Sequence, residues 1–252
     1  MNYLEQLSKP LSVDQIDFRI QSINKGGYAT ILAYKDARVD MHRLNEVFGV
    51  GKWQRKHELI NGQLFCSVGI HVDGEWAWVQ DVGTPSNTEA AKGQASDSFK
   101  RACFNLGIGI ELYDYPVIQV KLNQNEFTID NNGKAKQSWN LKLKEWSWFT
   151  QFTNGELTCI AAKDEKGRKR FQSGEYREGT DTSPQRAAYE NAEYITQVKE
   201  AIKQNDADTM RSIWLDIPEQ EQKALWIAPT KGGVFTTSER EFMTENMGSI
   251  LN

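Results

Sequence analysis

Two short stretches of the sequence combine basic and aromatic side chains. They are WQRKH at residues 53–57 and FKR at residues 99–101. Lysine and arginine neutralise phosphates and aromatic rings offer surfaces for bases, so this combination is typical of proteins that bind single-stranded nucleic acids. Lys100 and Arg101 also have a purely structural interpretation, in which Asp97 and Arg101 form an ion pair one helical turn apart.

The charge of the chain is unevenly distributed. The net charge of −4 does not by itself suggest a nucleic-acid binder. However, residues 181–252 hold 7 basic and 12 acidic residues, which leaves 23 basic and 22 acidic residues in positions 1–180. A single basic cluster is more often a solvated face, but the local field is what steers a polyanion. The clusters are Lys52, Arg55 and Lys56; Lys92, Lys100 and Arg101; and Lys163, Lys166, Arg168, Lys169 and Arg170.

The patterns of common nucleic-acid enzymes are missing from the sequence. The glycine loop at residues 49–53 lacks the hydroxyl that would hold magnesium in a nucleotide-binding loop. No nucleophile elbow occurs, and the histidines and cysteines lack metal-site spacing. We therefore expect no cofactor, no metal and no enzymatic activity. A metal-dependent nuclease stays open as an alternative because carboxylates occur at Asp81, Glu89, Asp97, Glu111 and Asp114.

The cysteine usage and the lack of apolar runs indicate a reducing, aqueous environment. Cys66, Cys103 and Cys159 are an odd number without redox spacing, so we expect them to be reduced core residues. No run approaches the about 18 apolar residues of a membrane span. The first residues also lack the pattern of a signal peptide. A cytoplasmic protein without a membrane partner is expected.

The elements that would position the basic residues begin with a three-stranded meander. Asn61-Gly62 and Asp73-Gly74 favour type I′ turns between strand-like runs. Alternate residues of the middle run should face the core, while the other face meets solvent or DNA. The predicted core-facing residues are Leu64, Cys66, Val68 and Ile70.

Two helices are predicted on either side of the meander in the sequence. Asp36 can cap a short amphipathic helix that ends at Gly49. Ser86 and Glu89 form a predicted capping box at the start of a long helix that should lie on the sheet. Its apolar stripe is Ala91, Ala95, Phe99, Ala102, Cys103 and Leu106, and a basic side carries Lys92, Ser96 and Lys100.

The remaining segments complete an α+β fold. Two strands joined at Gly26-Gly27 precede the first helix, a basic hairpin is predicted near residues 157–171, and a helical region ends at a Gly232-Gly233 break. We predict an antiparallel β-meander sheet packed on a long helix, a β-β-β-α core, plus a small C-terminal helical domain. The expected domains are a DNA-binding domain at 1–180 and an acidic helical domain at 186–252.

Three strings of the sequence together resemble the Rad52 superfamily of DNA single-strand annealing proteins, in particular its phage, Sak-like branch. They are AYKDARVDMHRLNEVFGVGKWQ from position 33, DVG from position 81, and KGQASDSFKRACFNLGIGIELY from position 92. The resemblance covers roughly residues 15–115.

The resemblance implies how such a protein would bind DNA. Subunits would assemble side by side into a ring or filament, with a single strand held in a basic groove, bases exposed, and no need for ATP. Lys100 and Arg101 would grip the DNA backbone at the groove floor, with Arg19 and Tyr34 nearby. Arg38 would hold the helix-start position, in a structural or a DNA-contacting role. Charge alone adds four more DNA-binding candidates, Lys52, Arg55, Lys56 and Lys92.

The expected function is therefore ATP-independent binding and annealing of single-stranded DNA in recombination and repair, in the cytoplasm of a bacterial host. One alternative is a strand-protecting protein that occludes the bases, and another is a protein-binding adaptor. The acidic residues 186–252 are expected to contact a partner exonuclease or a host single-strand-binding protein, or to shield the groove.

Overall fold

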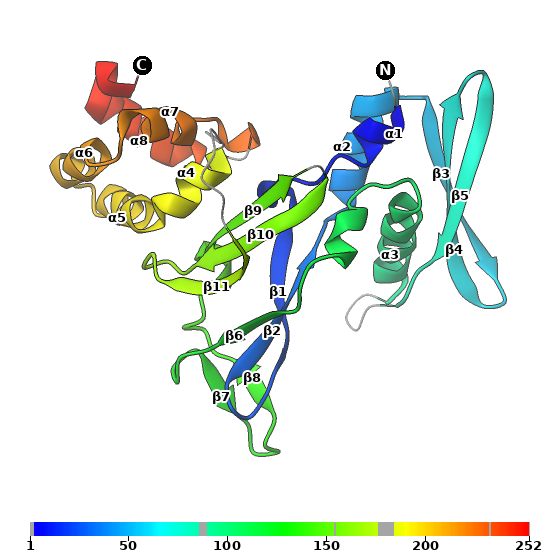
Figure 1. The fold of residues 1–252 in the computed structure, drawn as a ribbon, viewed down its shortest axis with the longest axis horizontal. Helices are drawn as coiled ribbons and strands as arrows, with labels where there is room; N and C mark the ends of the chain where they lie inside the picture. The colour runs from blue at the N-terminus through cyan, green and yellow to red at the C-terminus, as the bar shows by residue number, and fades with distance from the viewer. Residues whose placement is uncertain (1–2, 86–89, 154, 176–183, 232, 252) are drawn as a thin grey trace. The chain divides into compact units, whose positions relative to one another are not determined.

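The computed structural model describes residues 3–85, 90–153, 155–175, 184–231 and 233–251. Tertiary contacts divide the chain into two compact units. The first unit comprises Met1–Asp17 and Ala33–Tyr115, and the second comprises Phe18–Leu32 and Pro116–Asn252. Antiparallel sheets and several helices make up these units, so the predicted α+β class is confirmed (Figure 1).

The first unit contains the predicted meander. Strands β3 (Trp53–Ile60), β4 (Gln63–Val72) and β5 (Glu75–Val82) pair in that order, all antiparallel. Positive φ angles of 52° at Asn61 and 50° at Asp73, each followed by a glycine with positive φ, show why these two turns could be located from the sequence. In β4, Cys66, Val68 and Ile70 are buried as predicted, and Leu64 is half-buried.

Helix α3 (Ala90–Phe104) packs on β4 and β5, as predicted. Phe99, Ala102 and Cys103 are buried in one core with the inward side chains of β4. Full burial of a side chain as large as that of Phe99 contributes about 1.5–3 kcal/mol, so this layer fixes the helix on the sheet. The predicted stripe was too long, because Ala91 is exposed at the start of the helix. The predicted capping box of Ser86 and Glu89 lies outside the described residues.

The end of β5 touches the backbone of α3. A Cβ atom at Gly83 would lie 2.1 Å from the carbonyl oxygen of Gln94 and 2.6 Å from the backbone nitrogen of Ser98. The Gln94 side-chain amide donates to the Gly83 oxygen over 3.1 Å. The glycine of the DVG string is therefore required by close packing between strand and helix.

Helix α2 (Ala37–Phe48) is capped as the sequence predicts. The Asp36 side chain accepts a hydrogen bond from the Arg38 backbone N–H, and Gly49 ends the helix with a φ of 83°. The Arg43 guanidinium donates to three carbonyl oxygens in or just after α1 (Tyr3–Leu7), which joins the two helices. Two 3-10 turns, η1 (Val13–Gln15) and η2 (Ile110–Tyr113), complete the first unit.

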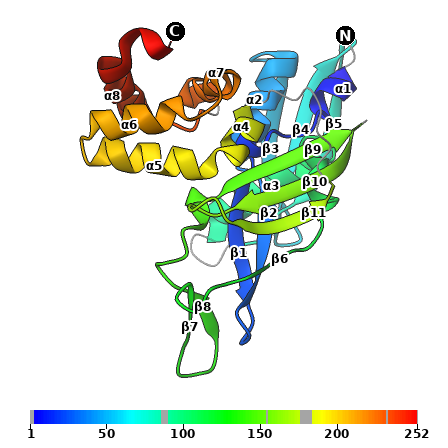
Figure 2. The same cartoon turned by 60° about the vertical axis from the view of Figure 1, so that its left-hand side comes forward.

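The strands of the second unit are short. β1 (Asp17–Ile23), β2 (Tyr28–Tyr34) and β6 (Ile118–Lys121) form one sheet, with β2 in the middle. β7 (Phe127–Ile129) and β8 (Ala135–Gln137) form a hairpin. After η3 (Leu143–Glu145), β9 (Ser147–Thr153), β10 (Glu156–Lys163) and β11 (Lys169–Gly174) form another three-stranded sheet (Figure 2).

The C-terminal helices also belong to the second unit. They are α4 (Pro184–Glu190), α5 (Ala192–Lys203), α6 (Ala207–Leu215), α7 (Glu219–Leu225) and α8 (Thr237–Met247), with η4 (Pro229–Lys231) and η5 (Gly248–Leu251). They share a core around Trp214, Met210 and Phe235. Helix α8 was not predicted from the sequence, although Thr236 and Glu239 form a capping box at its start. None of the helices in the described ranges combines the length and apolar character that crossing a bilayer requires.

Candidate nucleic-acid interface

Lys100 lies near the C-terminal end of α3, with its side chain half-buried. It makes no hydrogen bond and no ion pair with another residue of the described ranges. A hydrogen bond from Arg38 lowers the pKa of Asp36, and the charge of Lys100 lowers it further. Lys100 is thus a cation without a direct counter-ion in this part of the chain, which suits it to meet a phosphate.

Arg101 is held by the sheet rather than by its own helix. Its Nε atom lies 3.2 Å from Asp81 Oδ1 at the end of β5, with 42% of the arginine side chain exposed. The alternative pairing with Asp97 is not formed between these described residues, because Arg101 pairs with Asp81; Asp97 accepts a hydrogen bond from the Thr84 backbone N–H. An exposed pair of this kind contributes at most about 1 kcal/mol, but it orients the guanidinium. The two terminal nitrogens of Arg101 are left to donate to a phosphate.

The cluster of Lys52, Arg55 and Lys56 is not brought together. Consecutive strand residues point to opposite faces, and β3 places Arg55 opposite Val68 but Lys56 opposite Ser67. The Arg55 guanidinium stacks over the Phe99 ring, 4.6 Å from its centroid, on the side of α3.

Lys56 and Lys52 have other surroundings. Lys56 lies on the outer face of the sheet, with Nζ 5.7 Å from the centroid of the Trp78 ring. It also lies 3.6 Å from a Glu58 carboxylate oxygen. Lys52 is exposed in the turn that precedes β3. Of this cluster, only Arg55 shares a face with α3.

The other first-unit candidates lie on α3, on α2 and at the end of β2. Lys92 is exposed on α3, eight residues or about 12 Å along the helix axis from Lys100. Arg38 donates through Nε to Asp36 Oδ1 over 2.7 Å, and both side chains are exposed, so this arginine also supports the cap of α2. Tyr34 is half-buried at the end of β2.

The second unit carries the remaining candidates. Arg19 lies on β1 in the second unit, whereas Lys100 belongs to the first unit. The predicted basic hairpin exists as β10 and β11, but its arginines are neutralised. Arg170 is bound by Glu126 and Asp164, and Arg168 is bound by Asp164. The hairpin is therefore a weaker phosphate site than its sequence predicts.

A buried ion pair lies beside Lys100 and was not identified from the sequence. Lys35 and Asp40 are 1% and 0% exposed and bond each other, and the Lys35 ammonium also donates to the Ile108 carbonyl. Burial raises the pKa of Asp40 to about 6, an effect that Lys35 and then Lys100 oppose. Burial likewise lowers the pKa of Lys35. Asp40 shares one face of α2 with Leu44, and an acid at such a core position is the signal that could have revealed the pair.

The carboxylates proposed for a nuclease have other partners or lie apart. Asp81 binds Arg101, and Glu111 accepts a hydrogen bond from the Leu11 backbone N–H. Glu89 is outside the described ranges. Among the residues that the structure describes, no three histidine, cysteine, aspartate or glutamate side chains lie close enough to hold a metal ion. All three cysteines are buried and unpaired, as predicted.

A family model described as Rad52/22 family double-strand break repair protein matches residues 2–130, about half of the chain. The match includes Lys100, Arg101 and the other DNA-binding candidates up to position 101, but not the basic hairpin at residues 163–170. No curated protein matches the chain.

Proposed function

The chain belongs to the Rad52/22 family of double-strand break repair proteins, and from this we propose that it anneals complementary single strands of DNA without ATP. The family gives the chain a role in DNA repair and recombination. The observation that carries the finer proposal is the pair of adjacent cations on α3. Lys100 has no direct counter-ion within the described ranges, and Arg101 is aimed by Asp81. The quoted motifs further favour the phage, Sak-like branch and action in the cytoplasm of a bacterial host.

The proposed mechanism follows from phosphate binding. Contacts to the sugar–phosphate backbone fix the strand without reading its sequence, so any strand can be held. A strand gripped by its phosphates is free to present its bases to a second strand. Pairing then releases on average about 1.4 kcal/mol per stacked base-pair step, so a nucleotide is not needed as an energy source. The protein would be a binding protein rather than an enzyme.

Assembly into a ring or filament is part of the proposal. One subunit offers few phosphate contacts and should bind a strand weakly. When subunits lie side by side, each further contact is intramolecular and its effective concentration is high. The strand would therefore be held along many subunits while each contact stays exchangeable.

Binding should weaken steeply as salt increases. Each phosphate neutralised on a single strand contributes about −0.7 to the slope of log affinity against log salt concentration. With at least Lys100 and Arg101 in contact, we expect a slope steeper than about −1.4. Fluorescence anisotropy with a labelled oligothymidine at several salt concentrations measures it, with and without ATP and Mg²⁺. A nearly flat slope would count against phosphate binding, and strand cleavage with Mg²⁺ would support the nuclease alternative.

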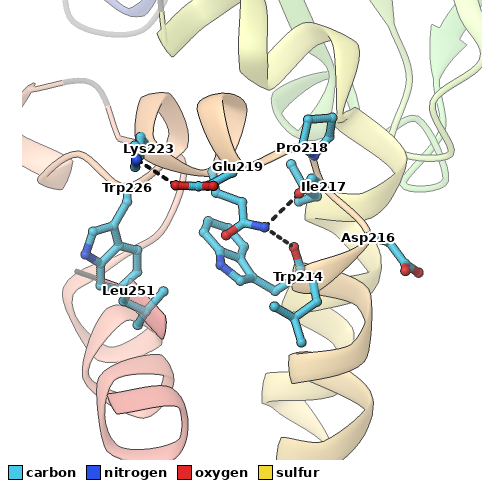
Figure 3. A pocket seen from close by; sticks show the side chains of 10 residues that line it. Trp214, Asp216, Ile217, Pro218, Glu219, Lys223, Trp226 and Leu251 are labelled. Atoms are coloured by element: carbon cyan, nitrogen blue, oxygen red, sulfur yellow. Dashed lines mark hydrogen bonds and ion pairs between the residues drawn. The ribbon is translucent and has the colours of Figure 1, made fainter. Parts of the chain in front are cut away.

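We also propose that the acidic C-terminal helices bind a protein partner, such as an exonuclease or a host single-strand-binding protein. A pocket of about 600 Å³ lies between α6, α7 and the C-terminal turn (Figure 3). The Gln222 amide donates to the carbonyl oxygens of Trp214 and Ile217, which holds the loop at the pocket wall. Leu215 lines the pocket and is 53% exposed, although it is apolar. The pocket therefore suits an apolar side chain of a partner.

The substitution Leu215→Glu tests this role in the full-length chain. It should slow annealing on strands coated with the host single-strand-binding protein several-fold and leave annealing on naked strands unchanged. Gln204→Glu adds the same charge on a residue outside the pocket lining and serves as the control. Equal rates for wild type and Leu215→Glu on coated strands would remove the support for this partner.

A further inference from the structure

Trp139 is the most exposed aromatic side chain in the described part of the chain. It lies in the second unit, between β8 and η3, and 81% of its surface is accessible. An indole exposed to this extent is not a core residue. The segment lies beyond residue 130, where the family match ends. Its role therefore does not follow from the family.

The backbone that carries Trp139 is firmly anchored. Ser138 donates through Oγ to the Asn125 carbonyl over 2.7 Å, and the Asn140 amide donates to the same oxygen over 3.1 Å. The backbone N–H of Leu141 donates to the carbonyl of Ser138, and the Leu141 side chain is buried. Trp139 is thus held at the tip of a fixed turn. A backbone that is already fixed loses little conformational entropy when its side chain binds a ligand.

Exposed lysines surround this turn in the sequence. Residues 134–145 contain four lysines and one glutamate, and all four lysines are exposed. Lys142 Nζ lies 5.6 Å from the centroid of the Trp139 ring. Within the described ranges, Lys142, Lys134 and Lys144 have no ion pair, whereas Lys136 binds Asp130 over 3.1 Å.

A further basic group lies at the adjoining hairpin turn. A Cβ atom at Gly133 would lie 3.5 Å from Lys25 Nζ, so this ammonium reaches the turn between β7 and β8. On the neighbouring strands, Lys121 Nζ lies 4.5 Å from the centroid of the Tyr28 ring. Lys25, in the turn between β1 and β2, and Lys121, on β6, therefore add to the positive charge of this segment.

We propose that residues 134–145 form a second contact for single-stranded nucleic acid, in which Trp139 stacks on one base and the neighbouring lysines bind phosphates. The choice of ligand rests on the proposed function, but the site is made of other residues than Lys100 and Arg101. Stacking requires an unpaired base with a free face, which a duplex does not offer. A lipid surface is less suited, because the residues beside Trp139 are polar or buried and leave little apolar area to insert.

The substitution Trp139→Ala should weaken binding of an oligothymidine between about 5-fold and about 150-fold, the range for loss of one stacked base. Trp139→Phe should retain most of the affinity, because a phenyl ring still stacks. An oligonucleotide with abasic sites keeps its phosphates and loses its stacking faces. Its affinity should therefore fall for the wild type and fall little further for Trp139→Ala. Equal effects of abasic sites on both proteins would overturn the stacking role.

The lysines are tested by salt dependence. Lys142→Ala/Lys144→Ala should make the salt slope about 1.4 shallower. Lys203→Ala, on an exposed helical position outside the pocket lining, removes one such charge and should leave the slope unchanged.

The outcome also separates this inference from the proposed function. If Lys100→Ala/Arg101→Ala abolishes binding while the Trp139 and lysine variants bind like the wild type, only the second contact is overturned. If none of these variants weakens binding, the second contact is overturned and the groove at Lys100 and Arg101 is overturned with it. Fluorescence of Trp139, taken as the difference between wild type and Trp139→Phe, should change with oligothymidine. A response to phosphatidylserine–phosphatidylcholine vesicles alone would overturn the nucleic-acid assignment.

Discussion

Replacing Lys100 and Arg101 together by alanine is expected to weaken single-strand binding by about 100-fold, because two charge-assisted contacts of about 1.5 kcal/mol each are lost. The salt slope should become shallower by about 1.4 at the same time. The fold should persist, since neither side chain belongs to the buried core of the first unit. Anisotropy titrations and thermal unfolding of the two proteins measure both expectations.

The control for this variant must account for Asp81. Removal of Arg101 leaves the Asp81 carboxylate, 21% exposed, without its partner. Asp81→Asn with Arg101 intact therefore reports what misorientation of the arginine costs. Lys203→Ala controls for the loss of an exposed positive charge elsewhere on the chain. Wild-type affinity in a folded Lys100→Ala/Arg101→Ala variant would show that the groove lies elsewhere.

Asp40→Ala is expected to destabilise the protein by about 3–5 kcal/mol, the usual cost of leaving a buried charge unpaired. Lys35 would lose its ion-pair partner at a position that is 1% exposed. Urea unfolding followed by circular dichroism measures the loss. A change below about 1 kcal/mol would show that Lys35 is solvated or neutral in the folded chain.

The double replacement Lys35→Met/Asp40→Leu should restore stability to about the wild-type level or above it, because burial disfavours both charged groups. The difference in stability between the double variant and the wild type should also depend on pH. The pKa of Asp40 is about 6 in the folded chain against 3.8 for a free aspartate, so the fold favours its protonated form. The stabilisation of the wild-type fold by protonated Asp40 is fully present below about pH 3.8 and is lost as the pH rises through 6.

The stability of the double variant relative to the wild type should therefore increase between pH 4 and pH 7. Urea unfolding of both proteins across this range provides the comparison, in which the titrating groups common to both proteins cancel. A difference that stays constant would show that Asp40 keeps an ordinary pKa. Single-strand binding by the double variant should be close to that of the wild type, because neither residue reaches the surface.

Local signals made much of the first unit predictable. The turns at Asn61-Gly62 and Asp73-Gly74 need positive φ angles, and the cap at Asp36 needs only its own side chain and the next turn of backbone. Such features depend on neighbours in sequence. The same holds for the inward face of β4, which follows from alternation alone.

Features that depend on distant segments were not predictable in this way. Arg101 pairs with Asp81 rather than Asp97 because the sheet brings the end of β5 beside α3. The neutralisation of Arg170 depends on Glu126, 44 residues away in the chain. By contrast, the separation of Arg55 from Lys56 follows from strand periodicity and could have been predicted.

The measurement that tests the proposed function most directly is the rate at which two complementary labelled oligonucleotides anneal. The rate is recorded by fluorescence energy transfer in a buffer that contains EDTA and no ATP. The wild-type protein should pair the strands much faster than they pair spontaneously, and Lys100→Ala/Arg101→Ala should lose this acceleration. Tight binding by the wild type with no acceleration of pairing would contradict the proposal and would make the protein a strand-protecting factor.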